Sequence, residues 1–206
     1  YGQVIGQATA SLQPGDHVHV HNLQMSNASA AHSLASVYQP TVYLEDTARF
    51  AGYMRADGRV GTRNYIGVIS SVNCSATVCK QIAAAFDAAC LRDYPNVDGV
   101  VAITHGSGCG MGAKGDGIEI LKRTLRGYAD HVNFAGVLVI GLGCEVNQLA
   151  PLMEQLADRP AVLKASLVIQ EAGGTRETVQ RGIALVQAML APVNRQQRSS
   201  VSASHL

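Results

Sequence analysis

Four apolar runs divide the chain from residue 65 onward, and each is rich in β-branched side chains. They cover residues 65–71, 99–104, 136–141 and 166–170. Within them apolar residues follow one another without regular polar alternation, which is the pattern of a strand covered on both faces. The runs therefore predict buried strands of a mainly parallel sheet.

Helical patterns separate these runs. Ala or Leu at helical spacing predicts helices at 75–91, 116–130, 146–158 and 175–191, with Ser75 and Thr175 as N-caps. Strands that alternate with helices imply right-handed crossovers. We therefore expect residues 65–192 to form an α/β domain, a three-layer sandwich around a Rossmann-like sheet.

A separate, small and incomplete β piece is expected at residues 1–40. Its segment 17–22 alternates His with Val or Asn, which predicts a strand with three imidazoles on one face. His19 and His21 would then lie about 6.6 Å apart and could share a metal ion, whereas His17 and His21 would be too far apart. A polar strand face that bonds a neighbouring loop is an equal alternative.

Residues 41–64 predict a linker followed by a loop rich in Arg and Gly, and residues 193–206 predict a polar tail that leads to a further domain. Arg55, Arg59 and Arg63 fall within nine residues. Guanidinium groups suit carboxylate recognition because they bind it through two parallel hydrogen bonds. For any single arginine, a solvated surface position is the alternative.

Three of the five cysteines follow predicted strands, namely Cys74, Cys109 and Cys144. The carboxyl ends of parallel strands meet at one edge of a sheet, about 4.8 Å apart, so the thiols could converge on one metal ion or cluster. A single cysteine in such a place is more often a small buried apolar residue. Cys79 and Cys90 fall inside the first predicted helix, and we interpret both as structural.

The amino-acid composition excludes some classes of binding partner. The chain has 16 Lys and Arg against 15 Asp and Glu, without a basic stripe, which argues against nucleic acid. No apolar stretch reaches the roughly 20 residues that span a bilayer. The cysteines are odd in number, and they are not spaced as in a small secreted domain with disulfides. We therefore expect reduced thiols and a cytoplasmic protein. The glycine-rich loops match neither the dinucleotide fingerprint nor the P-loop, so the expected ligand is a small anion.

Several motifs together resemble the altronate/galactarate dehydratase family of sugar-acid hydro-lyases. They are residues 55–65 (RADGRVGTRNY), the pair Asn73-Cys74, and the loops 105–110 and 141–145. Residues 15–22 resemble the end of the SAF-type β-clip domain that precedes the catalytic part in that family. The resemblance thus implies that residues 1–40 are a partial β-clip domain and that a C-terminal domain of the same polypeptide is missing.

The resemblance implies dehydration of a sugar acid of the altronate or galactarate type to a 2-keto-3-deoxy acid, with altronate slightly favoured. It also implies a divalent metal, usually Fe²⁺, with Mn²⁺ or an iron–sulfur cluster as alternatives. The chemistry agrees, because removing the proton next to a carboxylate builds charge there and expelling hydroxide needs an acid. A non-catalytic anion-binding module with structural cysteines is the alternative, and a homo-oligomer is compatible with either.

On this resemblance we expect His105 as general acid or base, Arg63 as carboxylate clamp and Glu145 as a third catalytic residue. The expected substrate-binding residues are Arg59, Asn64, Asn73, Gly106 and Gly108. The expected metal ligands are His19, His21, Cys74, Cys109 and Cys144.

Overall fold

The computed structural model describes residues 4–25, 37–157 and 162–206. It divides into two compact units, Tyr1–Leu44 and Glu45–Leu206. Part of the expected β piece, residues 26–36, and the last residue of the helix expected at 146–158 lie outside the described residues. Among the helices that are described, none has the length and apolarity to cross a membrane.

The larger unit contains a four-stranded parallel sheet. Its strands are β5 (Tyr65–Ser70), β6 (Gly99–Ile103), β7 (Phe134–Gly141) and β8 (Leu163–Val168), in the order β6-β5-β7-β8. Every neighbouring pair is parallel. The predicted α/β class and the parallel arrangement of the four apolar runs are therefore confirmed.

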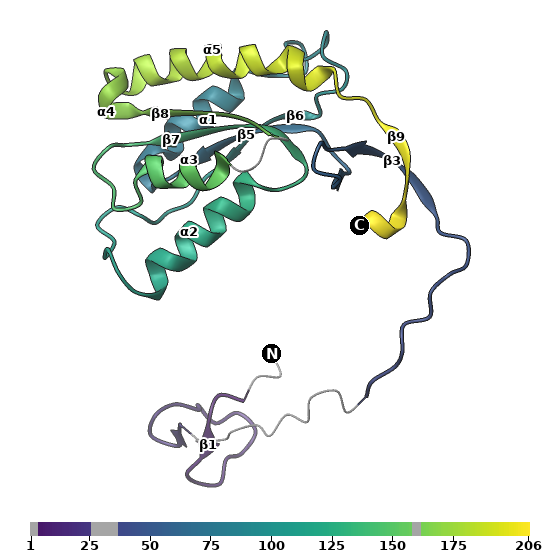
Figure 1. Cartoon of the computed structure of the whole chain (residues 1–206). Coiled ribbons are helices and arrows are strands. Elements are labelled where there is room, and N and C mark those ends of the chain that lie inside the picture. The colour runs from purple at the N-terminus through teal and green to yellow at the C-terminus, as the bar shows by residue number, and fades with distance from the viewer. Residues whose placement is uncertain (1–3, 26–36, 158–161) are drawn as a thin grey trace. The chain divides into compact units, whose positions relative to one another are not determined.

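Helices cover both faces of this sheet, as Figure 1 shows. They are α1 (Ala76–Ala84), α2 (Asp116–Ala129), α3 (Leu149–Ala157), the short α4 (Ile169–Ala172) and α5 (Thr175–Asn194). The helices α1 and α5 pack together over one face, and α2 and α3 over the other. The three expected layers are present.

The core consists of two apolar clusters, one on each face of the sheet. Leu138 and Ile140 of β7 belong to the cluster under α1 and α5, whereas Val137 and Val139 belong to the cluster under α2 and α3. Successive strand residues point to opposite faces, so a strand between two helical layers must be apolar throughout. This explains why the apolar runs lack regular polar alternation.

Several predicted element bounds differ from the structure: β7 begins at Phe134, α3 at Leu149 and β8 at Leu163, and α5 ends at Asn194. The first helix stops at Ala84 instead of residue 91, because Asp87 starts a turn in which its carboxylate accepts the Cys90 amide at 2.8 Å. Cys90 is therefore exposed and outside the helix, which corrects its interpretation as a structural residue of that helix. The last strand ends at Val168, where α4 begins, instead of at residue 170.

Of the two expected N-caps, Ser75 occupies the cap position of α1, whereas Thr175 does not occupy that of α5. Ser75 precedes α1 but makes no capping bond, because its hydroxyl donates to the carbonyl of Ile140 at 2.7 Å and to that of Val72 at 2.9 Å. Gly174 occupies the cap position of α5, and Thr175 is the first helical residue.

A second, antiparallel sheet joins the segments expected to be a linker and a polar tail. It comprises β4 (Val60–Gly61), β3 (Arg49–Met54) and β9 (Ser199–Ser202), in that order. Tyr53, Val60 and Val201 are buried. We expected a linker at residues 41–64 and a polar tail at residues 193–206. The structure instead pairs strands from these two segments, between residues about 150 positions apart.

The smaller unit has one short antiparallel pair, β1 (Gln7–Ala8) and β2 (Leu23–Gln24). The expected strand at 17–22 is wrong, because residues 17 and 18 are irregular and residues 19–22 form a bend and a turn. The Asn22 side chain closes this turn by accepting the His19 amide at 2.9 Å and donating to the His17 carbonyl at 3.1 Å. An asparagine can stabilise a turn in this way against extended structure.

Candidate active site

The carboxyl ends of β5 and β7 lie side by side, and their connections lead to opposite faces of the sheet. After β5 the chain enters η1 (Asn73–Ser75) and α1, whereas after β7 it leads to α3. Adjacent parallel strands that diverge in this way open a crevice beyond their carboxyl ends, which is where open α/β sheets bind ligands. Three predicted site regions, the loops with Cys74, His105 and Cys144, lie at this edge.

His105 follows β6 and is held on both sides. Its Nε2 lies 3.1 Å from the Ser70 carbonyl oxygen and its Nδ1 lies 3.1 Å from the Ser107 hydroxyl. A carbonyl can only accept, so Nε2 carries the proton and Nδ1 of the neutral ring is an acceptor. The ring is half-buried. His105 therefore offers a base to this edge of the sheet.

The loops after β5 and β6 touch each other. The Asn73 amide donates to the Ser107 carbonyl at 2.9 Å. Gly108 has a φ of 101°, and a Cβ there would lie 3.3 Å from Cα of Val72, whereas a Cβ on Gly106 would meet nothing within 4 Å. The absence of a side chain at Gly108 thus allows this close approach.

Glu145 lies in the loop after β7, and its carboxylate is buried. It accepts hydrogen bonds from the Ser71 hydroxyl at 2.7 Å, the Leu142 amide at 3.0 Å and the Gly143 amide at 2.5 Å. Burial alone would raise the pKa of Glu145, but the hydrogen bonds from Gly143 and Ser71 outweigh it and lower this pKa below its ordinary value. Glu145 is therefore an ionised group that joins two loops.

The three predicted thiols are exposed neighbours at this edge. A hydrogen bond with Cys109 raises the pKa of Cys74, and partial desolvation and the charges of Cys109 and Cys144 add to that effect. Cys79 is different, because its burial in α1 raises the pKa of its thiol to about 12. The sequence-based distinction between Cys79 and the three loop cysteines agrees with this arrangement.

Thiolates suit iron by chemical type. In the described part of the chain, however, no group of three or more His, Cys, Asp and Glu side chains is arranged to hold a metal ion. The thiols are thus neighbours without the convergence that a metal centre needs. The assignment of Cys74, Cys109 and Cys144 as ligands stays a prediction.

The histidines of the smaller unit gather in the turn at 17–22. The ring of His17 lies 5.5 Å from that of His19 and 6.0 Å from that of His21, measured between centroids. The argument that His17 lies too far from His21 was wrong, because it assumed an extended strand, yet the described residues hold no group of three such side chains that could bind a metal ion. His19 and His21 stay predicted ligands.

Arg59, Arg63 and Asn64 lie at the opposite, amino end of the parallel strands. Asn64 immediately precedes β5, and its amide donates to the Asp98 carboxylate, just before β6, at 2.6 Å. A strand of six residues separates the two ends by about 20 Å. The structure therefore does not bring these three predicted site residues together with His105 in one chain.

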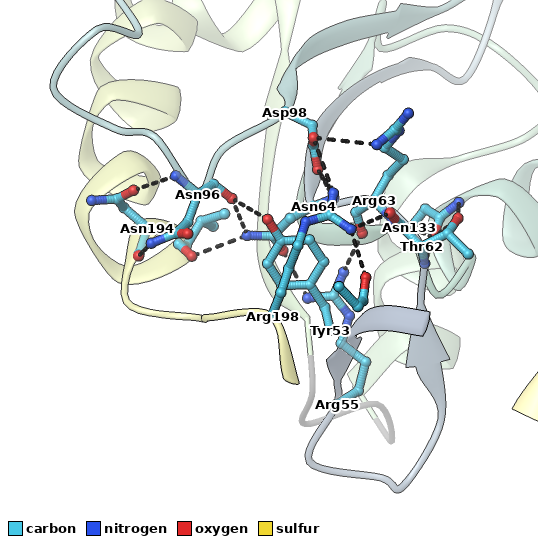
Figure 2. Close-up of polar contacts among 12 residues, drawn as sticks. Tyr53, Arg55, Thr62, Arg63, Asn64, Asn96, Asp98, Asn133, Asn194 and Arg198 are labelled. Atoms are coloured by element: carbon cyan, nitrogen blue, oxygen red, sulfur yellow. Dashed lines mark hydrogen bonds and ion pairs between the residues drawn. The ribbon is translucent and has the colours of Figure 1, made fainter. Parts of the chain in front are cut away.

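A buried guanidinium organises this amino end (Figure 2). Arg55 donates to the Val132 carbonyl and the Asn64 side chain, each at 2.8 Å, to the Arg63 carbonyl at 3.0 Å, and to the Gln196 side chain. Burial lowers the pKa of Arg55, yet its donors are satisfied. Arg55 ties the antiparallel sheet to the parallel one.

The other two arginines have carboxylate partners within the protein. Arg59 pairs with Asp57 at 2.8 Å and with Asp130 at 3.2 Å, and the hydrogen bond that Arg59 donates to Asp57 raises the pKa of Arg59. Arg63 is half-exposed and lies 3.9 Å from Asp98. Arg59 and Arg63 thus pair with carboxylates of their own chain.

Sequence reasoning missed the serines of the site. Ser70 is the last residue of β5, Ser71 follows it, and Ser107 lies in the loop after β6. Their signal was present, because small polar residues at the end of an apolar run fall at the ligand edge of a parallel sheet.

Comparison with known proteins agrees with the motifs. Residues 52–194 match the family model described as D-galactarate dehydratase/Altronate hydrolase, second domain. The chain is 36% identical over 166 residues to an altronate dehydratase of Escherichia coli (strain K12), covering 77% of this chain and 32% of that protein. It is 34% identical over 215 residues to a galactarate dehydratase (L-threo-forming) of the same strain, covering 100% and 41%.

An altronate dehydratase of Bacillus subtilis (strain 168) is 28% identical over 210 residues, which cover 100% of this chain and 40% of that protein. The chain thus spans about two fifths or less of the length of these relatives. Since the family model covers more than half of the chain, the protein belongs to the D-galactarate dehydratase/altronate hydrolase family.

Proposed function

We propose that this chain forms part of the active site of a sugar-acid dehydratase, at the carboxyl ends of β5, β6 and β7. The reaction is loss of water from an altronate-type or galactarate-type acid to give a 2-keto-3-deoxy acid. The observation that carries the proposal is the His105 imidazole, held between the Ser70 carbonyl and the Ser107 hydroxyl. Two of the three relatives are named altronate dehydratases, so altronate is the first substrate to test.

The chemistry of such a reaction matches this edge of the sheet. The hydrogen to be removed lies next to a carboxylate and becomes acidic only if the developing charge is stabilised. His105 supplies a proton acceptor, and the glycine-rich loop 105–110 supplies backbone N–H groups. The relatives' names favour this enzyme over a non-catalytic anion-binding module.

The substrate carboxylate also needs a cationic partner. Arg55, Arg59 and Arg63 lie at the other end of the strands and bond to their own chain. We therefore propose that the anchoring cation comes from a C-terminal domain of the same polypeptide, outside the two fifths or less of the relatives' length that this chain spans. Cytoplasmic location belongs to the same proposal.

Bound Fe²⁺, with Mn²⁺ or an iron–sulfur cluster as alternatives, stays a prediction that rests on the family. The described donors do not converge on a metal ion, so the steps that we assign to this chain do not run through one.

The test uses the full-length polypeptide that contains this chain, purified without oxygen and supplied with Fe²⁺. It is incubated with altronate, galactarate and the corresponding neutral sugars, and 2-keto-3-deoxy product is measured. Product from at least one acid and from no neutral sugar is expected. Product from a neutral sugar, or none from any acid, would overturn the proposal. His205→Gln, at an exposed position, is the control for His105→Gln.

A further inference from the structure

We propose that Ser107 is a positioning residue that holds His105 as the general base, with Nδ1 as the atom that accepts the substrate proton. This inference rests on the proposed function and deepens it, because the family resemblance left His105 as either acid or base. The observations that support it are the hydrogen bonds at the two ring nitrogens of His105.

The orientation of the ring follows from its two partners. Nε2 faces the Ser70 carbonyl at 3.1 Å, and Ser70 ends the central strand of the sheet. Turning the ring over would place a C–H group against that buried carbonyl and forfeit the hydrogen bond. Nε2 therefore keeps its proton, and proton exchange is left to Nδ1.

Ser107 defines the direction of Nδ1. Its hydroxyl lies 3.1 Å from Nδ1, and its amide donates to the same nitrogen at 3.3 Å. The backbone of Ser107 is itself held, because its carbonyl accepts the Asn73 amide at 2.9 Å. Gly108 packs directly on Val72. The loop after the central strand thus fixes Ser107, and Ser107 fixes the imidazole.

The Ser107 hydroxyl can form a hydrogen bond with His105 in both protonation states of the ring. It donates to the single lone pair of Nδ1 while the ring is neutral and turns away as the substrate proton arrives. Once the ring is protonated, the hydroxyl can accept from Nδ1–H, and the longer contact from the Ser107 amide is also released. Ser107 is exposed, whereas His105 is half-buried. A substrate can therefore approach Nδ1 from the Ser107 side without rearrangement of the strand ends.

The proton balance of the step is simple. The C–H bond next to the carboxylate breaks, its proton binds Nδ1, and the electron pair moves into the carboxylate. The electron pair then returns to form a carbon–carbon double bond as the neighbouring C–O bond breaks, and the hydroxide that leaves takes the proton from Nδ1 to become water. The enol that remains becomes the 2-keto acid by moving a proton from oxygen to carbon. His105 is neutral again after the cycle.

Nuclear magnetic resonance of histidine-labelled chain tests the geometry independently of activity. The His105 signals are assigned by their loss in His105→Gln. At a pH where the ring is neutral, we expect the Nε2–H tautomer, with an Nδ1 shift that moves in Ser107→Ala. A dominant Nδ1–H tautomer, or an Nδ1 shift that Ser107→Ala leaves unchanged, would overturn the inference.

Kinetics of the full-length enzyme test the role. His105→Gln should lower kcat by about 10²-fold to 10⁴-fold, as expected for a lost general base. Ser107→Ala should lower kcat by about tenfold with little change in KM, the effect of one hydrogen bond that orients the base. Ser107→Thr, which keeps the hydroxyl, should restore most of the rate, and exposed Ser199→Ala is the control.

The two proposals fail differently. A wild-type enzyme that dehydrates no sugar acid would refute the proposed function, while the tautomer would still be read from the spectra. An active enzyme in which Ser107→Ala and Ser107→Thr both behave as wild type would refute the role of Ser107 alone.

Discussion

The hydroxyl of Ser71 lies 2.7 Å from Oε1 of Glu145, and both side chains are buried. Ser71 follows the central strand β5, and Glu145 lies in the loop after β7. Ser70, the residue before, offers its carbonyl to His105 on the other side. The end of β5 therefore connects the loops after both neighbouring strands.

Replacing Glu145 by Gln should destabilise the fold. The Gln amide would keep one carbonyl oxygen and turn its NH2 group toward the backbone N–H of either Leu142 or Gly143, which leaves at least one part-buried donor unpaired. We expect the free energy of unfolding to fall by about 1–3 kcal/mol at pH 7. Urea denaturation measures it, with exposed Glu154→Gln as the matched control.

The effect of Glu145 should depend on pH. Because folding lowers its pKa, the stabilisation is complete above the pKa of the unfolded chain and is lost as pH falls through the folded value. The difference between wild type and Glu145→Gln should thus shrink below about pH 4. An equal difference at pH 7 and at the lowest pH where both fold would contradict the assigned ionised state.

The cysteines should divide by reactivity. Cys79 is buried with a pKa of about 12, so an alkylating reagent at pH 8 should leave it unmodified in the folded chain. The other four are exposed and should react, with Cys74 slower than Cys90 because its pKa is raised. Mass spectrometry of timed samples measures this. Early modification of Cys79 would refute the placement of α1.

Cys74→Ser, Cys109→Ser and Cys144→Ser test the predicted metal ligands. Each should reduce iron content or activity of the full-length enzyme if the thiols hold iron, whereas Cys90→Ser should be nearly neutral. Identical behaviour of all four variants would show that position at the strand ends carries no special role.

Arg55 should matter for stability and not for substrate binding. Arg55→Met leaves the Asn64 side chain and two carbonyls without their donor. We expect a loss of about 2–4 kcal/mol in the free energy of unfolding, typical of a broken buried network. Exposed Arg195→Met should change it little. Equal effects would contradict the structural role.

Replacement of two glycines in the loop after β6 by alanine should affect the stability of the fold to different extents. Gly108→Ala combines a positive φ with a close approach to Val72, so it should cost about 1–3 kcal/mol and displace the loop. Gly106→Ala meets no neighbouring atom within 4 Å and should be tolerated by the fold. Thermal unfolding of both variants provides the comparison, and similar losses would contradict the packing of the two loops.

Much of the parallel sheet could be predicted from sequence, because a strand covered on both faces needs an uninterrupted apolar run. Leu138 and Val139 point to opposite cores, and both must be apolar. The edge that carries the cysteines followed from the same reasoning, since parallel strands end together.

The positions of Arg63 and His17 in the structure could not be predicted from apolar runs. Arg63 precedes a strand and His105 follows one, so the length of β5 separates them, although both belong to motifs of one family. The pairing of β3 with β9 joins residues far apart in the chain, and β9 has only one apolar residue, Val201, so it gives no strand signal. The turn around His17 depends on one side chain, Asn22, that overrides the strand pattern.

The most direct test of the account compares His105→Gln with Arg63→Gln in the full-length, iron-supplied enzyme, with altronate as substrate and 2-keto-3-deoxy product as the readout. The account places the chemistry at the carboxyl ends of the strands. It predicts that His105→Gln loses turnover by about 10²-fold or more, whereas Arg63→Gln keeps the wild-type rate. Loss of turnover in Arg63→Gln with full activity in His105→Gln would contradict it.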